Sequence, residues 1–368
     1  MENITPQSSN VYFFLWAAVL IFFMKAGFIL IEIGQIRRKN VGVHMTLKFL
    51  DMSVVLIVYL FLGYAVSYGM QFLGGELTPG GTDVGSYAHF MKMVMFAVAT
   101  VTIVTGAVAE RIKISGYVVA VIIISSIIYP IGENLAWGAS GALTAIGFHD
   151  FAGSGVVHLV GGVLGLTAAI VLGARNGRFK NGKPLPIPGH DITYIVLGAF
   201  ILAFGWYGFN IGSAAFISEK GASIASVAVA TTMAIAGGTL GAAVMTKGDP
   251  IWCANGMCAG LVAVCAGADL FTPVSGLIEG SVAGAQTPLI FRFIEERGID
   301  DVCGVTPVHA VSGLWGVITA GIFIAKVSLI GQIIGAVALV AVASTSAFAI
   351  DSALNVIGLL RVSEDAAL

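Results

Sequence analysis

Apolar stretches long enough to cross a lipid bilayer follow one another along almost the whole chain. A transmembrane helix needs about 20 consecutive apolar residues, because a helix rises about 1.5 Å per residue and the hydrocarbon core is about 30 Å thick. Such stretches occur at residues 11–34, 50–70, 90–109, 116–136, 150–173, 191–211, 223–245, 251–270, 275–291, 305–325 and 329–360. The pattern predicts an all-α polytopic membrane protein of eleven transmembrane helices, with residues 1–368 forming one membrane domain.

Composition supports the membrane assignment. Hydrophobic residues make up 57% of the chain and charged residues 10%, and the mean hydropathy is +0.95, far above that of soluble globular proteins. The net charge of −2 gives no overall basic field of the kind that binds nucleic acid. Lipid is therefore the expected surrounding partner, and nucleic acid is not.

The positive residues predict an orientation. With the N-terminus outside, the cytoplasmic segments hold thirteen basic residues, whereas the external segments hold only Lys220 and Lys326. The thirteen are Arg37, Arg38, Lys39, Arg111, Lys113, Arg175, Arg178, Lys180, Lys183, Lys247, Arg292, Arg297 and Arg361. Because cytoplasmic loops carry the excess of Lys and Arg, we expect an external N-terminus and a cytoplasmic C-terminus in the plasma or inner membrane.

The cysteines do not indicate a disulfide framework or a metal centre. Cys253, Cys258, Cys265 and Cys303 lie in or beside apolar segments without the CxxC spacing of zinc sites. Neither a metal nor another cofactor is predicted. An activated nucleophile is likewise not visible, so the sequence does not favour a membrane enzyme.

A short repeat links two distant parts of the chain. Residues 150–162 read DFAGSGVVHLVGG and residues 301–313 read DVCGVTPVHAVSG, with six identical positions. The identical pairs are Asp150/Asp301, Gly153/Gly304, Val157/Val308, His158/His309, Val160/Val311 and Gly162/Gly313. With the predicted orientation these segments enter the membrane from opposite sides. We therefore expect an inverted five-plus-five repeat, with a first half at 11–173, a second half at 191–325 and a final helix at 329–360.

The repeat predicts that two histidines meet inside the membrane. His158 and His309 each follow the matched aspartate by eight residues, which on a helix is about 12 Å, close to the middle of a core about 30 Å thick. A histidine at that depth needs a partner or a cavity. One interpretation is a simple interhelical hydrogen bond. The other is a pore in which two neutral imidazoles receive a small polar solute, because burial disfavours the imidazolium form.

The chain resembles the ammonium transporter family (Amt/MEP/Rh) over essentially its whole length. The similar segments are RRKNV at 37–41, GAVAERIK at 106–113, DFAGSGVVH at 150–158, FGWYGFNIGSA at 204–214, and the VHAVSGLWG stretch that ends at 316. The resemblance implies a homotrimer with one pore per subunit, an external site that recruits ammonium, an aromatic constriction, and a twin-histidine channel for ammonia, with or without a separately moving proton.

The resemblance also assigns roles to individual positions. Phe96, Trp137 and Ser213 match the recruitment site, where ring faces attract a cation and a hydroxyl accepts a hydrogen bond. Asp150 corresponds to the family's buried aspartate near that site, which orients backbone groups. Phe209 matches the second phenylalanine near the constriction. His158 and His309 match the twin pair, in agreement with the internal repeat.

Three ionisable residues depart from the family pattern. Lys92 stands where relatives usually carry the outer phenylalanine, four residues before Phe96, and a fixed cation there should repel ammonium. Lys25 replaces a position that is usually uncharged, and Glu279 lies inside the ninth predicted helix. One hypothesis is that Glu279 or a neighbouring subunit compensates Lys92. The alternative is that both side chains extend to the external headgroups.

Two functions remain open at this point. The first is a channel-like transporter that recruits ammonium and conducts ammonia past the histidines. The second is an ammonium sensor that binds its ligand with little or no transport and signals to a cytoplasmic module, such as a fused histidine kinase, or to a regulator. The intact Phe96, Trp137, Ser213 and histidine pair favour transport, whereas Lys92 favours sensing.

Overall fold

The computed structural model is a bundle of helices and describes residues 6–69, 84–138, 140–214 and 223–363. Its elements, with η for short 3-10 or π-helical turns, are α1 (Pro6–Gln35), η1 (Arg38–Asn40), α2 (Val41–Val58), η2 (Tyr59–Gly63), α3 (Tyr64–Tyr68), α4 (Val84–Val108), α5 (Ile114–Ile123), η4 (Ile124–Ile128), α6 (Tyr129–Trp137), α7 (Ala142–Ala145), η5 (Ser154–Leu159), α8 (Val160–Leu172), β1 (Phe179–Lys180), β2 (Lys183–Pro184), α9 (Ile192–Ala214), α10 (Ile224–Thr246), α11 (Pro250–Val264), α12 (Pro273–Glu295), η7 (Thr306–Val311), α13 (Ser312–Phe323) and α14 (Leu329–Val356). The all-helical fold class is confirmed.

Within the described residues, nine helical segments are long and apolar enough to cross a membrane. They fall on nine of the eleven predicted stretches. The remaining two stretches contain α11, which is apolar but shorter, and α12. The protein is thus a polytopic membrane protein, while the count of eleven crossings stays a prediction.

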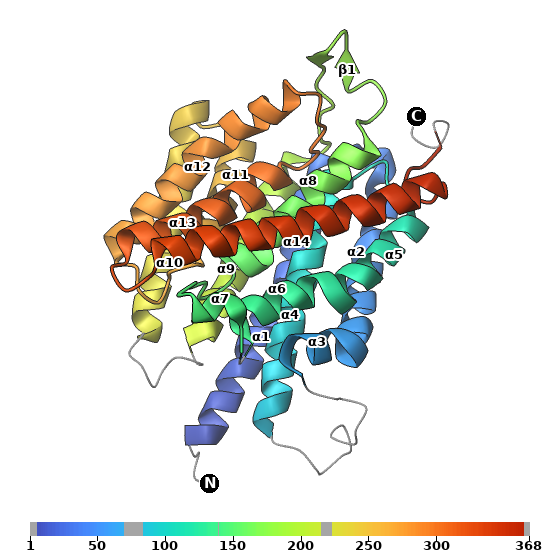
Figure 1. The fold of residues 1–368 in the computed structure, drawn as a ribbon. Helices are drawn as coiled ribbons and strands as arrows, with labels where there is room; N and C mark the ends of the chain where they lie inside the picture. Colours follow the sequence, from blue (N-terminus) through green and yellow to red (C-terminus); the bar gives the residue numbers. More distant parts are fainter. Residues whose placement is uncertain (1–5, 70–83, 139, 215–222, 364–368) are drawn as a thin grey trace.

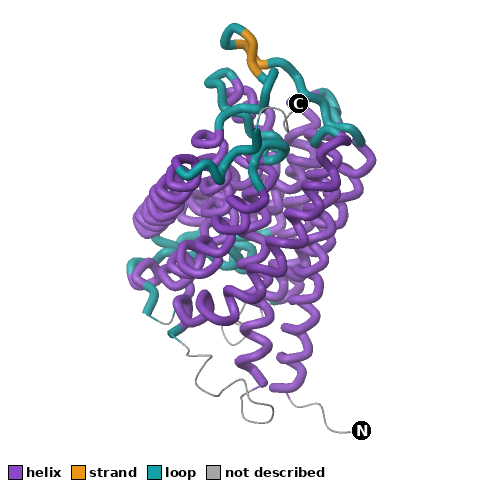
Figure 2. Tube along the Cα trace, turned by 90° about the vertical axis from the view of Figure 1, so that its right-hand side faces the viewer, coloured by secondary structure: helices purple, strands orange, loops and turns teal. Residues whose placement is uncertain are grey.

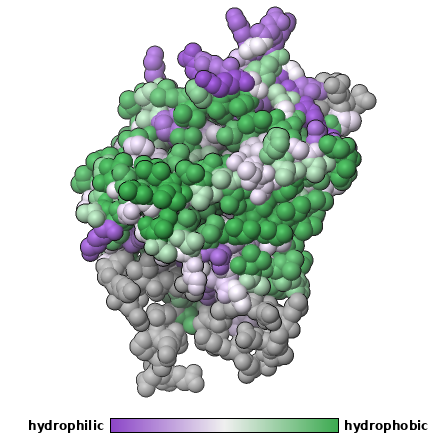
Figure 3. All heavy atoms as spheres, viewed as in Figure 1, coloured by the Kyte–Doolittle hydropathy of each residue, from purple (hydrophilic) through white to green (hydrophobic). Residues whose placement is uncertain are grey.

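The outer surface of the bundle is apolar around its middle and polar toward one end. Figure 3 shows hydrophobic residues over the face crossed by α14 and hydrophilic residues gathered at the upper end, near the β1–β2 hairpin. Large side chains such as Phe200, Ile330 and Val337 are more than 60% exposed. A continuous apolar surface of this kind is suited to lipid.

The two ends of the bundle are distinct. Figures 1 and 2 show the beginning of α1 at the lower end and the β1–β2 hairpin at the upper end, where most of the loops gather. The long helix α14 lies obliquely across one face, where it packs on α8 and α13.

The second helical segment begins earlier than the apolar pattern predicts, at Val41 rather than at residue 50. Lys48 lowers the hydropathy just before the predicted start, and Asp51 follows inside the predicted stretch. Both side chains are buried and paired with residues of α1. Lys48 forms an ion pair with Glu32 of α1, and Asp51 forms one with Lys25. Because these charges are paired, the helix continues through a region that hydropathy alone would exclude.

A cluster of ion pairs joins four loops at the polar end of the bundle. Asp300 accepts hydrogen bonds from the Nε of Arg175 at 2.8 Å and the Nε of Arg178 at 3.2 Å. Arg175 also contacts Glu110 at 2.7 Å, and Glu110 contacts the Nε of Arg37 at 3.0 Å. Burial by itself would raise the pKa of Asp300, but the hydrogen bonds and charge of Arg175 lower it to about 2.

We expect the D300N substitution to destabilise the protein by about 3 kcal/mol at pH 7, because it leaves buried arginines without their carboxylate. The folded pKa of Asp300 lies below its ordinary value of 3.8, so its stabilisation is present above about pH 4 and is lost as the pH falls toward 2. The difference in unfolding temperature between wild type and D300N, measured in detergent, should therefore become smaller as the pH falls from about 4 toward 2.

The matched control is R292Q, which breaks an exposed ion pair between Arg292 and Glu296 at 2.9 Å. Such a pair contributes less than about 1 kcal/mol, so R292Q should leave the unfolding temperature nearly unchanged. Equal effects of the two substitutions would contradict the importance of the buried cluster.

Candidate functional site

The two segments that share the sequence repeat also share a local structure. Each begins at an aspartate whose side chain accepts hydrogen bonds from the first backbone N–H groups of a π-helical turn, and these donors have no intrahelical partner. Asp150 accepts from Gly153, Gly155 and Val156 at 2.8 to 3.1 Å, ahead of η5. Asp301 accepts in the same manner ahead of η7. The aspartates therefore fix where each histidine-bearing turn begins.

Two glycine pairs of the repeat have matching roles. Gly153 and Gly304 both have positive φ, at 103° and 71°, which turns the chain from the aspartate into the helix. A Cβ on Gly162 would lie 2.3 Å from the backbone N of Ala310, beside His309, and a Cβ on Gly313 would lie 2.8 Å from the backbone N of Leu159, beside His158. Each half thus presents a glycine to the turn that carries the other half's histidine.

This packing brings the two histidines together. The Nδ1 atoms of His158 and His309 lie 3.2 Å apart, and the rings are nearly parallel, with centroids 5.3 Å apart. Both side chains are buried, and the Nε2 of His158 has no hydrogen-bond partner within the described residues. One Nδ1 must donate and the other accept, so the pair leaves one Nε2 as acceptor and the other as donor.

Aromatic rings surround the histidine pair. Trp206 of α9 stacks on His158, with centroids 5.1 Å apart and planes at 16°. Phe209, one turn further along α9, lies 5.4 Å from His158, and Phe28 of α1 lies 6.0 Å from His309. These contacts hold the imidazoles in an apolar environment, where a charged solute is far more costly than a neutral one.

A larger pocket lies on one side of the pair. Its lining includes Phe96, Trp137, Asp150 and Ser213, together with Lys92. The Phe96 ring lies 5.8 Å from Trp137 and 4.2 Å from Phe209, so Phe96 and Phe209 separate this pocket from His158. The residues that the sequence assigned to a recruitment site and a constriction therefore lie together, in that order.

Asp150 contributes to this pocket through the backbone as well. Its carbonyl oxygen accepts a hydrogen bond from the indole N–H of Trp137 at 2.7 Å, while its carboxylate is occupied by the N–H groups of η5. A single residue thereby fixes the indole of the pocket and the start of the turn that carries His158. The role of Asp150 as an orienting residue of a recruitment site stays a prediction.

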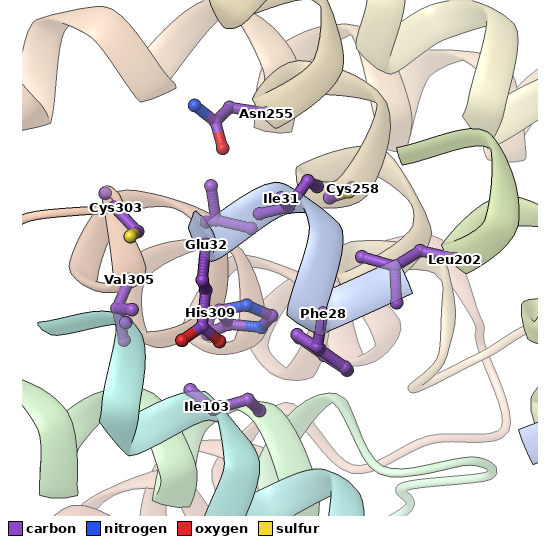
Figure 4. A pocket seen from close by; sticks show the side chains of 13 residues that line it. Phe28, Ile31, Glu32, Ile103, Leu202, Asn255, Cys258, Cys303, Val305 and His309 are labelled. Atoms are coloured by element: carbon purple, nitrogen blue, oxygen red, sulfur yellow. The ribbon is translucent and has the colours of Figure 1, made fainter. Parts of the chain in front are cut away.

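A second pocket lies on the other side, against His309. Figure 4 shows Phe28 and Glu32 of α1 beside His309 in this pocket. Glu32 is buried and its carboxylate contacts Lys48, His44 and Thr105. The histidine pair therefore lies between two pockets. After the orientation expected from the sequence, we call the pocket of Phe96 and Trp137 the outer pocket and the pocket of Phe28 and Glu32 the inner pocket.

The three unusual ionisable residues lie in different surroundings. Lys25 is buried in an ion pair with Asp51 and also contacts Thr102. Lys92 is 3% exposed, and its Nζ lies 3.2 Å from the Oγ of Ser213. Glu279 is buried on α12, and its carboxylate oxygens have no hydrogen-bond partner among the described residues. Lys92 and Glu279 thus point into the subunit and are not joined to each other within it.

Sequence reasoning missed several residues at this site. Trp206 lies inside the segment FGWYGFNIGSA and was not singled out, although a large ring next to Phe209 on the same helix was visible there. Glu32 was also missed. The search for ionisable residues within the apolar stretches singled out those that depart from the family pattern, Lys25, Lys92 and Glu279. A search that did not use the family pattern would also have found Glu32 and Asp51.

The part of the chain that the structure describes contains no group of three His, Cys, Asp or Glu side chains that could hold a metal ion. The functional groups that line the two pockets and the passage between them include the aromatic rings, the hydroxyl of Ser213, the two imidazoles, the amino group of Lys92 and the carboxylate of Glu32. These groups are suited to a small hydrogen-bonding solute.

Comparisons with known proteins point in one direction. The family model described as Ammonium Transporter Family matches residues 12–367. The chain is 56% identical over 365 residues to ammonium transporter Amt1 of Methanocaldococcus jannaschii, covering 97% of this chain and 93% of the relative. Among solved structures, one titled Sensor Amt Protein has a TM-score of 0.92 at 29% identity, covering 100% of this chain and 98% of the other. Candida albicans Mep2 has a TM-score of 0.84 at 24% identity, covering 97% and 86%, and supports the fold alone.

We expect D150N to destabilise the protein by about 1–3 kcal/mol. An asparagine amide has one acceptor oxygen in place of two, so at least one buried N–H at the start of η5 would face another donor. Thermal unfolding of purified protein in detergent measures the effect.

D249N serves as the control. Asp249 is exposed and caps α11 by accepting from the backbone N–H groups of Ile251 and Trp252. Asparagine is an equally good cap at such a position, so D249N should change stability by less than about 0.5 kcal/mol. A D150N variant as stable as D249N would show that the buried carboxylate is not needed.

Proposed function

This chain belongs to the ammonium transporter family, and we propose that it recruits ammonium at the pocket of Phe96, Trp137 and Ser213 and conducts ammonia past His158 and His309. The observation that carries this proposal is the contact of the two imidazoles, with 3.2 Å between their Nδ1 atoms, between a pocket that His309 lines and a pocket that Phe96 and Phe209 separate from His158. A buried histidine pair with an unpartnered Nε2 is costly unless a solute uses it.

The outer pocket has the chemistry for a small cation. The rings of Phe96 and Trp137 both line this pocket, with centroids 5.8 Å apart and planes at 44°, and the faces of such rings attract ammonium groups. Ser213 places a hydroxyl at the same pocket that can accept one ammonium hydrogen bond. Asp150 holds the indole of Trp137 and acts as a positioning residue.

The passage beyond Phe96 favours an uncharged solute. Phe209 and Trp206 pack against His158, so a permeating cation would lose its water between apolar rings. Ammonia can donate to one imidazole nitrogen and accept from the other, as the shared Nδ1 proton requires. We infer that ammonium transfers its proton to a water molecule in the outer pocket, which has room for water, before it reaches the histidines. Ammonia then passes, with or without a proton that moves separately.

We also infer that residues 11–173 and 191–325 are inverted repeats within the single domain 1–368. The matched carboxylates of Asp150 and Asp301, the positive φ of Gly153 and Gly304, and the reciprocal approach of the two glycine-bearing helices support it. Two turns related in this way would reach the centre of the membrane from opposite sides.

The assembly and orientation that we propose follow the family. We propose a homotrimer in the plasma or inner membrane, with an external N-terminus and a C-terminus in the cytoplasm. The excess of basic residues in the expected cytoplasmic loops supports this orientation.

A second function, ammonium sensing, is favoured by one specific observation. The structure titled Sensor Amt Protein superimposes over 100% of this chain with a TM-score of 0.92. In that case the pocket would bind ammonium with little transport, and a cytoplasmic module or regulator at the C-terminus would respond to occupancy. Lys92, which enters the outer pocket, fits a site that binds without passing its ligand.

We expect H158A and H309A each to reduce ammonium-evoked current in proteoliposomes by at least tenfold, because the one imidazole left in each variant loses its hydrogen-bonding partner. The control is H190A, which removes an exposed histidine far along the chain from both turns. Currents of wild-type size in both pore variants would exclude the twin-histidine pathway.

Ammonium binding, measured by calorimetry on the same wild-type protein, separates the two functions. Binding accompanied by current supports transport. Binding without current supports the sensor. In either case W137A should raise the dissociation constant of ammonium at least tenfold, because it removes the π face of the indole.

A further inference from the structure

The side chain of Lys92 lies in the outer pocket against the groups that a free ammonium ion would use. Lys92 and Phe96 are four residues apart on α4, so their side chains share one face of the helix. The Nζ of Lys92 lies 5.0 Å from the centroid of the Phe96 ring and 3.2 Å from the Oγ of Ser213. These are one ring face and one hydroxyl acceptor of the proposed recruitment site.

The position of this amino group is well determined by its surroundings. Lys92 is 3% exposed, so its charged end does not extend into a polar surface layer. Ser213 donates its own proton to the carbonyl oxygen of Phe209 at 3.0 Å, which leaves the oxygen of its hydroxyl to accept from Lys92. The hydroxyl is therefore oriented as an acceptor for a cationic N–H group at this point.

We propose that Lys92 supplies a tethered ammonium group that occupies the recruitment site and thereby sets its affinity and selectivity for free ammonium. The proposal rests on the function proposed above, because it takes the pocket of Phe96, Trp137 and Ser213 as the ammonium site. Lys92 is in this sense a specificity-determining residue, which a ligand must displace.

The tethered group competes with a free cation in two ways. It takes the hydroxyl oxygen of Ser213 and one face of Phe96, so fewer favourable contacts remain. A second positive charge in the same pocket is also repelled by the amino group of Lys92, more strongly than two charges at the same separation in bulk water. A tethered competitor acts at an effective concentration on the order of millimolar or above. Neutral ammonia meets only the first of these penalties, so the pocket discriminates against cations.

The expected compensation of Lys92 by Glu279 is not seen within the described residues, where the carboxylate of Glu279 does not hydrogen-bond to Lys92. The carboxylate oxygens of Glu279 have no hydrogen-bond partner among the described residues, and Glu279 lies near Trp315 and Thr319 on α13. The hydroxyl of Ser213 and the ring of Phe96 are the contacts of Lys92 that line the same pocket.

The test measures ammonium chloride and methylammonium chloride binding by calorimetry on the purified full-length protein, with potassium chloride as the reference salt. K92M keeps the length of the side chain and removes its amino group. We expect K92M to lower the dissociation constant of ammonium at least tenfold. K92R keeps the charge and should remain within about threefold of wild type.

The matched control is K326M, which removes an exposed lysine expected on the same side of the membrane. K326M should bind ammonium like wild type. A gain in ammonium affinity equal to that of K92M would show that the effect comes from surface charge in general, and it would overturn the proposal. If K92M does not yield a monodisperse protein, K92Q replaces it under the same expectation.

Two further variants separate this proposal from the function on which it rests. In the K92M background, S213A should remove most of the gained affinity, because the freed hydroxyl is the contact that ammonium gains. Unchanged or weaker binding by K92M, together with weaker binding by W137A, would overturn the role of Lys92 and leave the recruitment site standing. Binding that responds to none of W137A, S213A and K92M would overturn the recruitment site and this inference together.

Discussion

Burial of polar and ionised side chains inside an apolar helical bundle is the constraint on which this structure depends. Each such group must find its partner on another helix, because neither lipid nor the packed interior offers water. Lys48 pairs with Glu32, and Lys25 pairs with Asp51, across the first two helical segments. The polar end is joined by Arg175 and Asp300. These pairings fix which helices are neighbours and how the helices are aligned along their axes.

The same requirement produces the functional site. The first N–H groups of a helix that begins inside the protein need acceptors, and Asp150 and Asp301 provide them for η5 and η7. The aspartates fix the two turns, and the glycines allow the turns to approach closely. The Nδ1 atoms of His158 and His309 therefore lie 3.2 Å apart, surrounded by aromatic rings. The site is thus a product of how helix ends are satisfied within the membrane, and this explains why one aspartate touches both the indole of Trp137 and the turn that holds His158.

Lys92 is also a buried ionisable side chain with partners on other residues, and those partners change the interpretation of the pocket. From the sequence, a cation beside an expected cation site suggested repulsion or an external partner. In the structure it is accommodated by the acceptor and the ring that a free ammonium ion would use. On the function proposed above, binding of free ammonium would therefore replace the amino group of Lys92 at the hydroxyl of Ser213 and the ring of Phe96. Transport and sensing share this exchange and differ in whether the ligand then passes the histidines.

The sequence by itself determined the helical class and the positions of most apolar segments, and it predicted the pairing of His158 with His309 through the repeat. Its resemblance to a family added Phe96, Trp137 and Ser213, which the structure brings to one pocket. Those features depend on local composition and spacing, which hydropathy and motif matching detect. Only the tertiary structure decided that α2 begins at Val41, that Glu32 lies beside the inner pocket, that Trp206 stacks on His158 and that Lys92 reaches Ser213. Each of these depends on a contact between helices, in one case across 121 residues of chain. The energy of a buried charge is set by the partner that the fold brings to it, and no pattern along the chain contains that information.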